Sequence, residues 1–78
     1  MEVVFDEKTI GFLEGCVDKE RIFKKIIESR DNPYHFYERL TGLQLYKLRV
    51  GNYRVIAEIK NNLRMLLIGH RKNIYSKL

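Results

Sequence analysis

The fold is decided by the stretch Gln44–Ile59, which reads Q-L-Y-K-L-R-V-G-N-Y-R-V-I-A-E-I. Two runs of alternating apolar and polar residues flank Gly51-Asn52, a pattern typical of two strands joined by a tight turn. Glycine in the first central position favours a type II′ turn. The residues that then face one another are Val50–Tyr53, Arg49–Arg54, Leu48–Val55, Lys47–Ile56 and Tyr46–Ala57.

This register gives the hairpin two faces of different chemistry. The almost wholly apolar face, which helices are expected to cover, carries Tyr46, Leu48, Val50, Tyr53, Val55, Ala57 and Ile59. The other face carries Leu45, Lys47, Arg49, Arg54, Ile56 and Glu58. Because like charges directly opposite on a ladder are destabilising, the Arg49–Arg54 pair indicates an anionic ligand on this second face.

The rest of the chain predicts an α+β fold. Glu2 to Phe5 is a β-type run. Asp6 is expected to cap a short helix that turns Ile10, Leu13 and Phe12 inward and stops at Gly15. Asp18 is expected to cap a second helix over residues 19–30, with an inward stripe of Ile22, Phe23, Ile26 and Ile27. Asn32-Pro33 ends that helix, and residues 34–42 form an irregular connection rich in aromatic side chains.

No linker or repeat divides the chain, so a single domain over residues 1–78 is expected.

A third strand is predicted after a turn at Asn61-Asn62, which completes an antiparallel three-strand meander. If Lys60 faces Leu63, the ladder continues with Glu58–Met65, Ile56–Leu67 and Arg54–Gly69.

Further expectations follow from this third strand. Gly69 would leave room beside Arg54 for a ligand to approach the backbone. A row of apolar side chains, Leu63, Met65 and Leu67, would lie exposed on the basic side and offer a docking surface to a partner. Arg71 would join that side if the strand continues, and the last residues would form a short helix or tail.

Charge and cysteine content narrow the function classes. The net charge is +5, but residues 1–42 sum to −2 and residues 43–78 to +7, which indicates an anionic partner for the second half of the chain. The single cysteine, Cys16, excludes an internal disulfide framework. No apolar run reaches the ~20 residues of a membrane span, and no secretory signal pattern is present. We therefore expect a cytoplasmic protein that does not bind a membrane.

The predicted cluster of Lys47, Arg49, Arg54 and Arg71 suits a phosphate. Arginine guanidinium groups bind phosphate oxygens in two-point contacts, and cations stabilise charge that develops on a phosphoryl centre. His70 and Tyr75 follow closely in sequence. Histidine is the usual general acid or base, although strict alternation would turn His70 to the apolar side, near Tyr53. Tyrosine stacks on bases, although Tyr75 would serve equally as sheet packing.

These residues are sufficient for an RNase in which the ribose 2′-hydroxyl attacks its own phosphate, a reaction that needs no metal, cofactor or protein nucleophile. The sequence contains no metal-binding motif, glycine-rich phosphate loop or Ser/His/Asp arrangement.

The stretch L-x-G-L-x-L-Y-K-L-R-V-G-N-Y-R-V-I-A-E-I, followed by I-G-H-R-K-x-I-Y, resembles the RelE/ParE superfamily of toxins from prokaryotic toxin–antitoxin pairs. The resemblance implies the same small fold, βααβββ with a short C-terminal element. The superfamily contains both ribosome-dependent mRNA endonucleases and gyrase inhibitors, so the activity stays open between them, and a degenerate member that only binds antitoxin and operator DNA is a third alternative.

The resemblance also implies roles for individual residues. Lys47 matches the first catalytic lysine of the RelE branch, and Arg49 stands where a second lysine or an arginine is common. Arg54 matches a phosphate-binding arginine, Arg71 one that stabilises charge, and Tyr75 a tyrosine that stacks on the cleaved nucleotide. His70 occupies a variable position and is a further possible catalytic residue. The presence of all five matched positions favours the mRNA interferase branch.

The partners implied by the resemblance are a small acidic antitoxin, the ribosome and its mRNA. Operator DNA would be bound only through the antitoxin complex. Arg49 can act only electrostatically, because a guanidinium does not lose its proton in proteins.

Overall fold

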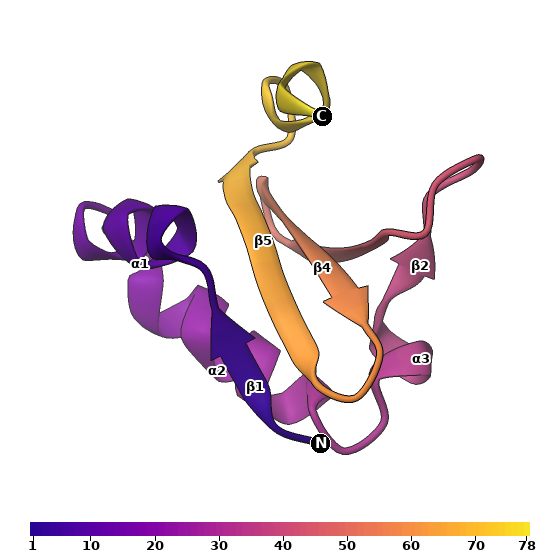
Figure 1. Cartoon of the computed structure of the whole chain (residues 1–78). Coiled ribbons are helices and arrows are strands. Elements are labelled where there is room, and N and C mark those ends of the chain that lie inside the picture. The colour runs from indigo at the N-terminus through magenta and orange to yellow at the C-terminus, as the bar shows by residue number, and fades with distance from the viewer.

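The computed structural model describes residues 1–78 and contains five strands, three α-helices and a terminal 3-10 helix. Their order is β1 (Val3–Phe5), α1 (Glu7–Glu14), α2 (Lys19–Ser29), α3 (Pro33–Phe36), β2 (Glu38–Arg39), β3 (Tyr46–Val50), β4 (Tyr53–Ile59), β5 (Leu63–His70) and η1 (Ile74–Lys77). The strands form one sheet in the order β1-β5-β4-β3-β2. Helices α1 and α2 lie on one side of it (Figure 1). The predicted α+β fold is therefore confirmed, and β1 joins the meander as a strand parallel to β5.

The β3–β4 hairpin has the predicted register throughout, from Val50↔Tyr53 to Tyr46↔Ala57. Gly51 has a φ of 56°, and no non-glycine residue has a positive φ. A positive φ at the first central residue alone is the signature of a type II′ turn, whose twist matches that of the flanking strands. The turn residues therefore fix which side chains share each face.

The β4–β5 register differs from the expectation near its turn. Ile59 pairs with Leu63 and Glu58 with Arg64, so the predicted Glu58–Met65 pair is wrong. A β-bulge between Ile56 and Ala57 then shifts the ladder by one residue on β5, which restores the predicted Ile56–Leu67 and Arg54–Gly69 pairs. The turn is one residue longer than expected, and the extra residue of the bulge compensates for it.

This shift also overturns the expected exposed apolar row. Leu63 and Met65 are completely buried in the core under the helices, and only Leu67 of the three lies on the opposite face, where it is half-buried. The predicted docking surface for a partner is therefore wrong, because a shift of one residue in register moves a side chain to the other face of a sheet.

The core lies between the helices and one face of the sheet, here called the helix face. Its twelve buried residues are Ile22, Ile26, Tyr37, Leu48, Val50, Tyr53, Val55, Ala57, Ile59, Leu63, Met65 and Ile68. The helix stripes are narrower than predicted, because Ile10 and Phe23 are 47% and 48% exposed. Phe23 stacks on Phe5 at 5.9 Å between ring centroids, while Phe12 and Leu13 pack against the core as expected.

The two predicted capping residues occupy the N-cap positions of α1 and α2, but neither side chain caps its helix. The Asp6 carboxylate instead accepts hydrogen bonds from Arg64 of β5, at 3.0 Å from Nε and 2.8 Å from a terminal nitrogen. The hydroxyl of Thr9 donates to the Asp6 carbonyl oxygen at 2.6 Å. Asp6 therefore ties the start of α1 to the sheet.

The connection after α2 is more regular than predicted, since it contains α3 and the two-residue strand β2. Pro33 starts α3, where its missing N–H costs nothing. Tyr37 follows in the core, and its hydroxyl lies 3.2 Å from Ser29 Oγ and donates to Met65 Sδ at 3.7 Å. Burial raises the pKa of Tyr37 to about 12, against a smaller lowering by the Ser29 hydrogen bond.

No helix of the chain has both the length and the apolar character that crossing a membrane requires.

Candidate functional site

The face of β3–β5 turned away from the helices carries the predicted cations and is here called the basic face. Lys47 and Arg49 come from β3 and Arg54 from β4, and the register places Arg49 directly opposite Arg54. Arg49 is exposed, while Lys47 and Arg54 are half-buried. Neither Arg49 nor Arg54 has an acidic partner within ion-pair distance. Two unneutralised guanidinium groups thus sit at adjacent strand positions.

The guanidinium group of Arg54 is held by the hairpin turn. One terminal nitrogen donates to the carbonyl oxygen of Gly51 at 3.0 Å and to that of Tyr53 at 2.8 Å. These carbonyl groups carry partial negative charge, so they offset part of the repulsion from Arg49. The bonds fix the position of one nitrogen, and the remaining N–H groups of Arg54 make no hydrogen bond within the protein.

Lys47 and Tyr75 lie together further along the same face. The Lys47 ammonium is 5.9 Å from the centroid of the Tyr75 ring, within the range of a cation–π contact. It also lies 3.8 Å from a carboxylate oxygen of Glu38 on β2. Tyr75 itself is 43% exposed. An exposed aromatic ring beside an ammonium group presents a stacking surface and a charge to the same ligand.

Gly69 lies opposite Arg54 as predicted, but the space above it is not open. A Cβ atom at this position would be 3.1 Å from Cδ1 of Ile74, which is completely buried. The expectation that Gly69 admits a ligand to the backbone is therefore wrong. The glycine accommodates the first residue of η1 instead.

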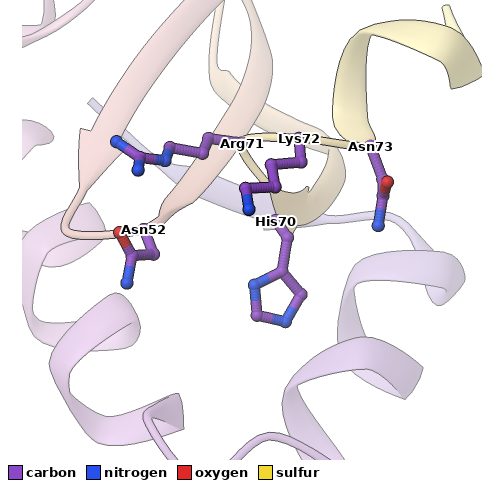
Figure 2. A pocket seen from close by; sticks show the side chains of 5 residues that line it. All are labelled: Asn52, His70, Arg71, Lys72 and Asn73. Atoms are coloured by element: carbon purple, nitrogen blue, oxygen red, sulfur yellow. The ribbon is translucent and has the colours of Figure 1, made fainter.

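Arg71 and His70 lie at the end of β5, beside the hairpin turn. The strand ends at His70, and the Arg71 N–H donates to the Asn52 carbonyl oxygen at 2.8 Å. A polar hollow of about 320 Å³ opens here, lined by Asn52, His70, Arg71, Lys72 and Asn73. Figure 2 shows the Arg71 side chain reaching toward the hairpin turn, while the His70 ring points away from it toward the helices.

His70 contacts the helix side of the molecule. It pairs with Tyr53 across the ladder, and the two ring centroids are 4.7 Å apart at an angle of 33°. This is the orientation that strict strand alternation predicts. The neighbouring Cys16 thiol, burial and the nearby Asp18 carboxylate raise the pKa of Tyr53 to about 12. His70 is thus held against a neutral phenol, on the other side of the sheet from Lys47.

Sequence reasoning missed Arg21, which approaches the hairpin turn from the first turns of α2. Its guanidinium nitrogen lies 2.9 Å from where a Cβ of Gly51 would stand. With Arg71 and Lys72, it increases the positive charge around this turn. The sequence carried no local signal for this placement, because it depends on how α2 docks on the sheet.

Acidic side chains neutralise little of the positive charge of the site. The four ion pairs of the protein are Lys25–Glu28, Lys47–Glu38, Lys60–Glu58 and Arg64–Asp6, and of the basic-face cations only Lys47 takes part in one. No group of three His, Cys, Asp or Glu side chains is arranged to hold a metal ion. The site therefore offers cations, an aromatic ring and hydrogen-bond donors, which are the groups that bind a phosphodiester.

A solved structure supports the fold. The chain superimposes on a chain of the RelB–RelE antitoxin–toxin complex from Methanococcus jannaschii with a TM-score of 0.75 and 24% identity. The match covers 96% of this chain and 98% of that one. No curated protein matches the sequence.

A family model matches nearly the whole chain. The family is described as "ParE toxin of type II toxin-antitoxin system, parDE", and its model aligns with residues 3–75, from the first strand to the tyrosine of the site. The match and the fold agree on the superfamily predicted from the hairpin sequence. The chain therefore belongs to the ParE toxin family and is a toxin of a type II toxin–antitoxin system.

Proposed function

We propose that this toxin is a metal-independent endoribonuclease that cleaves mRNA on the ribosome. The observation that carries the proposal is the exposed Tyr75 ring beside the Lys47 ammonium, on the face that also holds Arg49 and Arg54. A nucleotide base can stack on Tyr75 while its phosphate meets the cations. The basic C-terminal half would also bind ribosomal RNA phosphates. The proposal places the protein in the cytoplasm, where ribosomes are.

The reaction is an internal transfer of the phosphoryl group. The ribose 2′-oxygen attacks the adjacent phosphorus, a P–O2′ bond forms, and the P–O5′ bond breaks. The 2′-hydroxyl loses one proton and the departing 5′-oxygen gains one, which leaves a 2′,3′-cyclic phosphate and a 5′-hydroxyl. Arg49, Arg54 and Arg71 stabilise the charge that develops on the phosphoryl oxygens.

Lys47 is the one cation among the proposed site residues that can exchange a proton, because the others are arginines. We assign it the 2′-hydroxyl proton, which it accepts in its neutral form. His70 is not assigned a step, because its ring lies against Tyr53.

The substitution Lys47→Arg tests the role of Lys47. The variant keeps a positive charge at this position but cannot accept the 2′-hydroxyl proton, so cleavage should fall by about 100-fold. The measurement is single-turnover cleavage of ribosome-bound mRNA. Cleavage within about twofold of the unmodified toxin would show that Lys47 acts as a cation and not as a base.

The activity itself is tested by primer extension on a message after translation with the purified toxin. Cuts are expected at codons in the ribosomal A site, and Arg71→Ala should reduce them by about 100-fold or more. Lys8→Ala is the matched control, because Lys8 is an exposed cation on α1, on the other side of the sheet. An uncut message, or equal cutting by Arg71→Ala, would reject the endonuclease.

Gyrase inhibition is the second candidate, and the family match favours it, because the matched family is named for ParE toxins. In this case the basic face would bind protein or DNA and perform no chemistry. A supercoiling assay should then show arrested gyrase together with intact mRNA. Full supercoiling in the presence of the toxin would reject this candidate.

We further propose a small acidic antitoxin as partner, consistent with family membership. Its acidic segment would cover the basic face, and operator DNA would be bound through that complex. The product of an adjacent acidic reading frame should relieve the growth arrest that the toxin causes. Arg49→Glu should weaken the complex by charge repulsion, which pull-down of the two co-expressed chains would measure.

A further inference from the structure

The short helix η1 is anchored to the basic face by a single buried side chain. Ile74 is completely buried, although it is not part of the twelve-residue core under the helices. It packs over Gly69, where a Cβ atom would lie 3.1 Å from Ile74 Cδ1 and 3.9 Å from Ile74 Cβ. The first distance is shorter than an ordinary van der Waals contact between carbon atoms. The absent side chain at Gly69 therefore sets how deeply Ile74 sits.

The same contact controls the residue that follows. Tyr75 is 43% exposed and has its ring 5.9 Å from the Lys47 ammonium. The segment before it is a compact turn, because the Asn73 N–H donates to the His70 carbonyl oxygen at 3.0 Å. Ser76 then donates to the Asn73 carbonyl oxygen from its N–H at 3.2 Å and from its hydroxyl at 2.7 Å. These bonds shape the turn locally, but only Ile74 fastens it into the sheet surface.

We propose that the Gly69–Ile74 contact is a positioning device that sets the Tyr75 ring over Lys47. Ile74 fills the position left by the missing Gly69 side chain, and a ring on the next residue of a tight helix moves with it. The inference rests on the proposed function in one respect, that Tyr75 receives a nucleotide base. Gly69 and Ile74 touch no substrate and act only through Tyr75.

The test uses side chains of complementary size. Gly69→Ala adds a methyl group that pushes Ile74 outward, while Ile74→Val removes the Cδ1 atom that the new methyl group would meet. The Gly69→Ala protein should cleave ribosome-bound mRNA about tenfold more slowly in single-turnover assays, as expected for a displaced positioning group. The double variant Gly69→Ala/Ile74→Val should recover to within about twofold of the unmodified toxin.

A second readout does not depend on cleavage. The ε-methylene protons of Lys47 lie near the Tyr75 ring, so their NMR chemical shift reports where the ring is. Gly69→Ala should move this resonance toward the value seen in Tyr75→Ala, and the double variant should return it. Gly11→Ala is the matched control, because a Cβ there meets nothing within 4 Å. It should leave both readouts unchanged.

Three results would overturn the inference. One is a Lys47 resonance that does not move in Gly69→Ala. Another is failure of Ile74→Val to restore it. The third is a further loss of cleavage when Gly69→Ala is added to Tyr75→Ala, since a device that acts through Tyr75 has no effect in its absence. If the unmodified toxin does not cleave mRNA, the proposed function fails, and the Lys47 resonance alone decides the positioning role.

Discussion

The two faces of the sheet are stabilised in very different ways. The helix face contributes most of a twelve-residue core under α1 and α2, whereas the basic face has only two fully buried apolar side chains, Ile56 and Ile74. Since hydrophobic burial is the main stabilising contribution in a domain of this size, the helix face carries the fold. The basic face is therefore free to hold like charges side by side. Leu48 and Arg49, neighbours on β3, show the division most directly.

The largest expected effect comes from breaking the helix face. Leu48 is 1% exposed, and Leu48→Ala should lower the free energy of unfolding by about 2–5 kcal/mol, because it removes buried methyl groups and leaves a cavity. In a small domain with roughly 5 kcal/mol of stability, much of the protein would be unfolded at 37 °C. Urea denaturation followed by circular dichroism gives the value.

A matched substitution on the same strand sharpens this result. Lys47→Ala, one residue away on the basic face, should change the free energy of unfolding by no more than about 0.5 kcal/mol. Equal losses from the two variants would show that the faces do not divide stability in this way.

An intermediate effect is expected at alkaline pH, again on the helix face. The pKa of Tyr37 is raised from 10.0 to about 12 in the folded protein, so the folded state retains the proton that the unfolded state loses. Stability is therefore unaffected below pH 10 and falls as the pH rises from 10 toward 12. The full loss from this residue is about 2–3 kcal/mol.

Tyr37→Phe removes one of two such groups and should lessen the fall in stability; the part that remains belongs to Tyr53, whose pKa is also raised to about 12. Denaturant titrations between pH 9 and pH 11.5 compare the two proteins. Tyr34→Phe is the control, because Tyr34 is 64% exposed and its loss should leave the slope as it was. Parallel curves for Tyr37→Phe and the unmodified protein would mean that Tyr37 ionises equally in both states.

The smallest change in stability belongs to the basic face. Arg49→Gln removes one member of a like-charged cross-strand pair, so the free energy of unfolding should stay the same or rise by about 0.2–1 kcal/mol. Toxic activity should fall, because the proposed phosphate contact of Arg49 is lost. Thermal unfolding and mRNA cleavage are measured on the same preparation. A protein that loses stability on this substitution would assign the pair to the fold and not to a ligand.

The sequence predicted the elements whose conformation is determined by residues close together in the chain. In the β3–β4 hairpin, Gly51 sets the turn and strict alternation sets the register, so every residue pair was predicted correctly. The fold class followed from the order of these elements. The placement of His70 against Tyr53 also followed from alternation alone.

The missed features depend on tertiary contacts. The turn before β5 and the bulge between Ile56 and Ala57 each change the register by one residue, and their effects cancel at Ile56. Neither the turn nor the bulge contains a glycine or proline that would indicate it in the sequence. Ile74 over Gly69 and Arg21 beside Gly51 join elements distant in sequence, so no spacing rule reveals them. The roles of Lys47, Arg49, Arg54, Arg71 and Tyr75 remain predictions for the experiments above.

The parallel pairing of β1 with β5 has a consequence for how the toxin is made. Val3 pairs with Leu63, and Phe5 with Met65, so the sheet joins segments near opposite ends of the sequence. Contacts of such long range slow folding, because the loop between them must close before they form. During translation, β1 has no partner strand until β5 has been synthesised and has left the ribosome. The five-stranded sheet is therefore completed late, and the edge of β1 that pairs with β5 stays open until then.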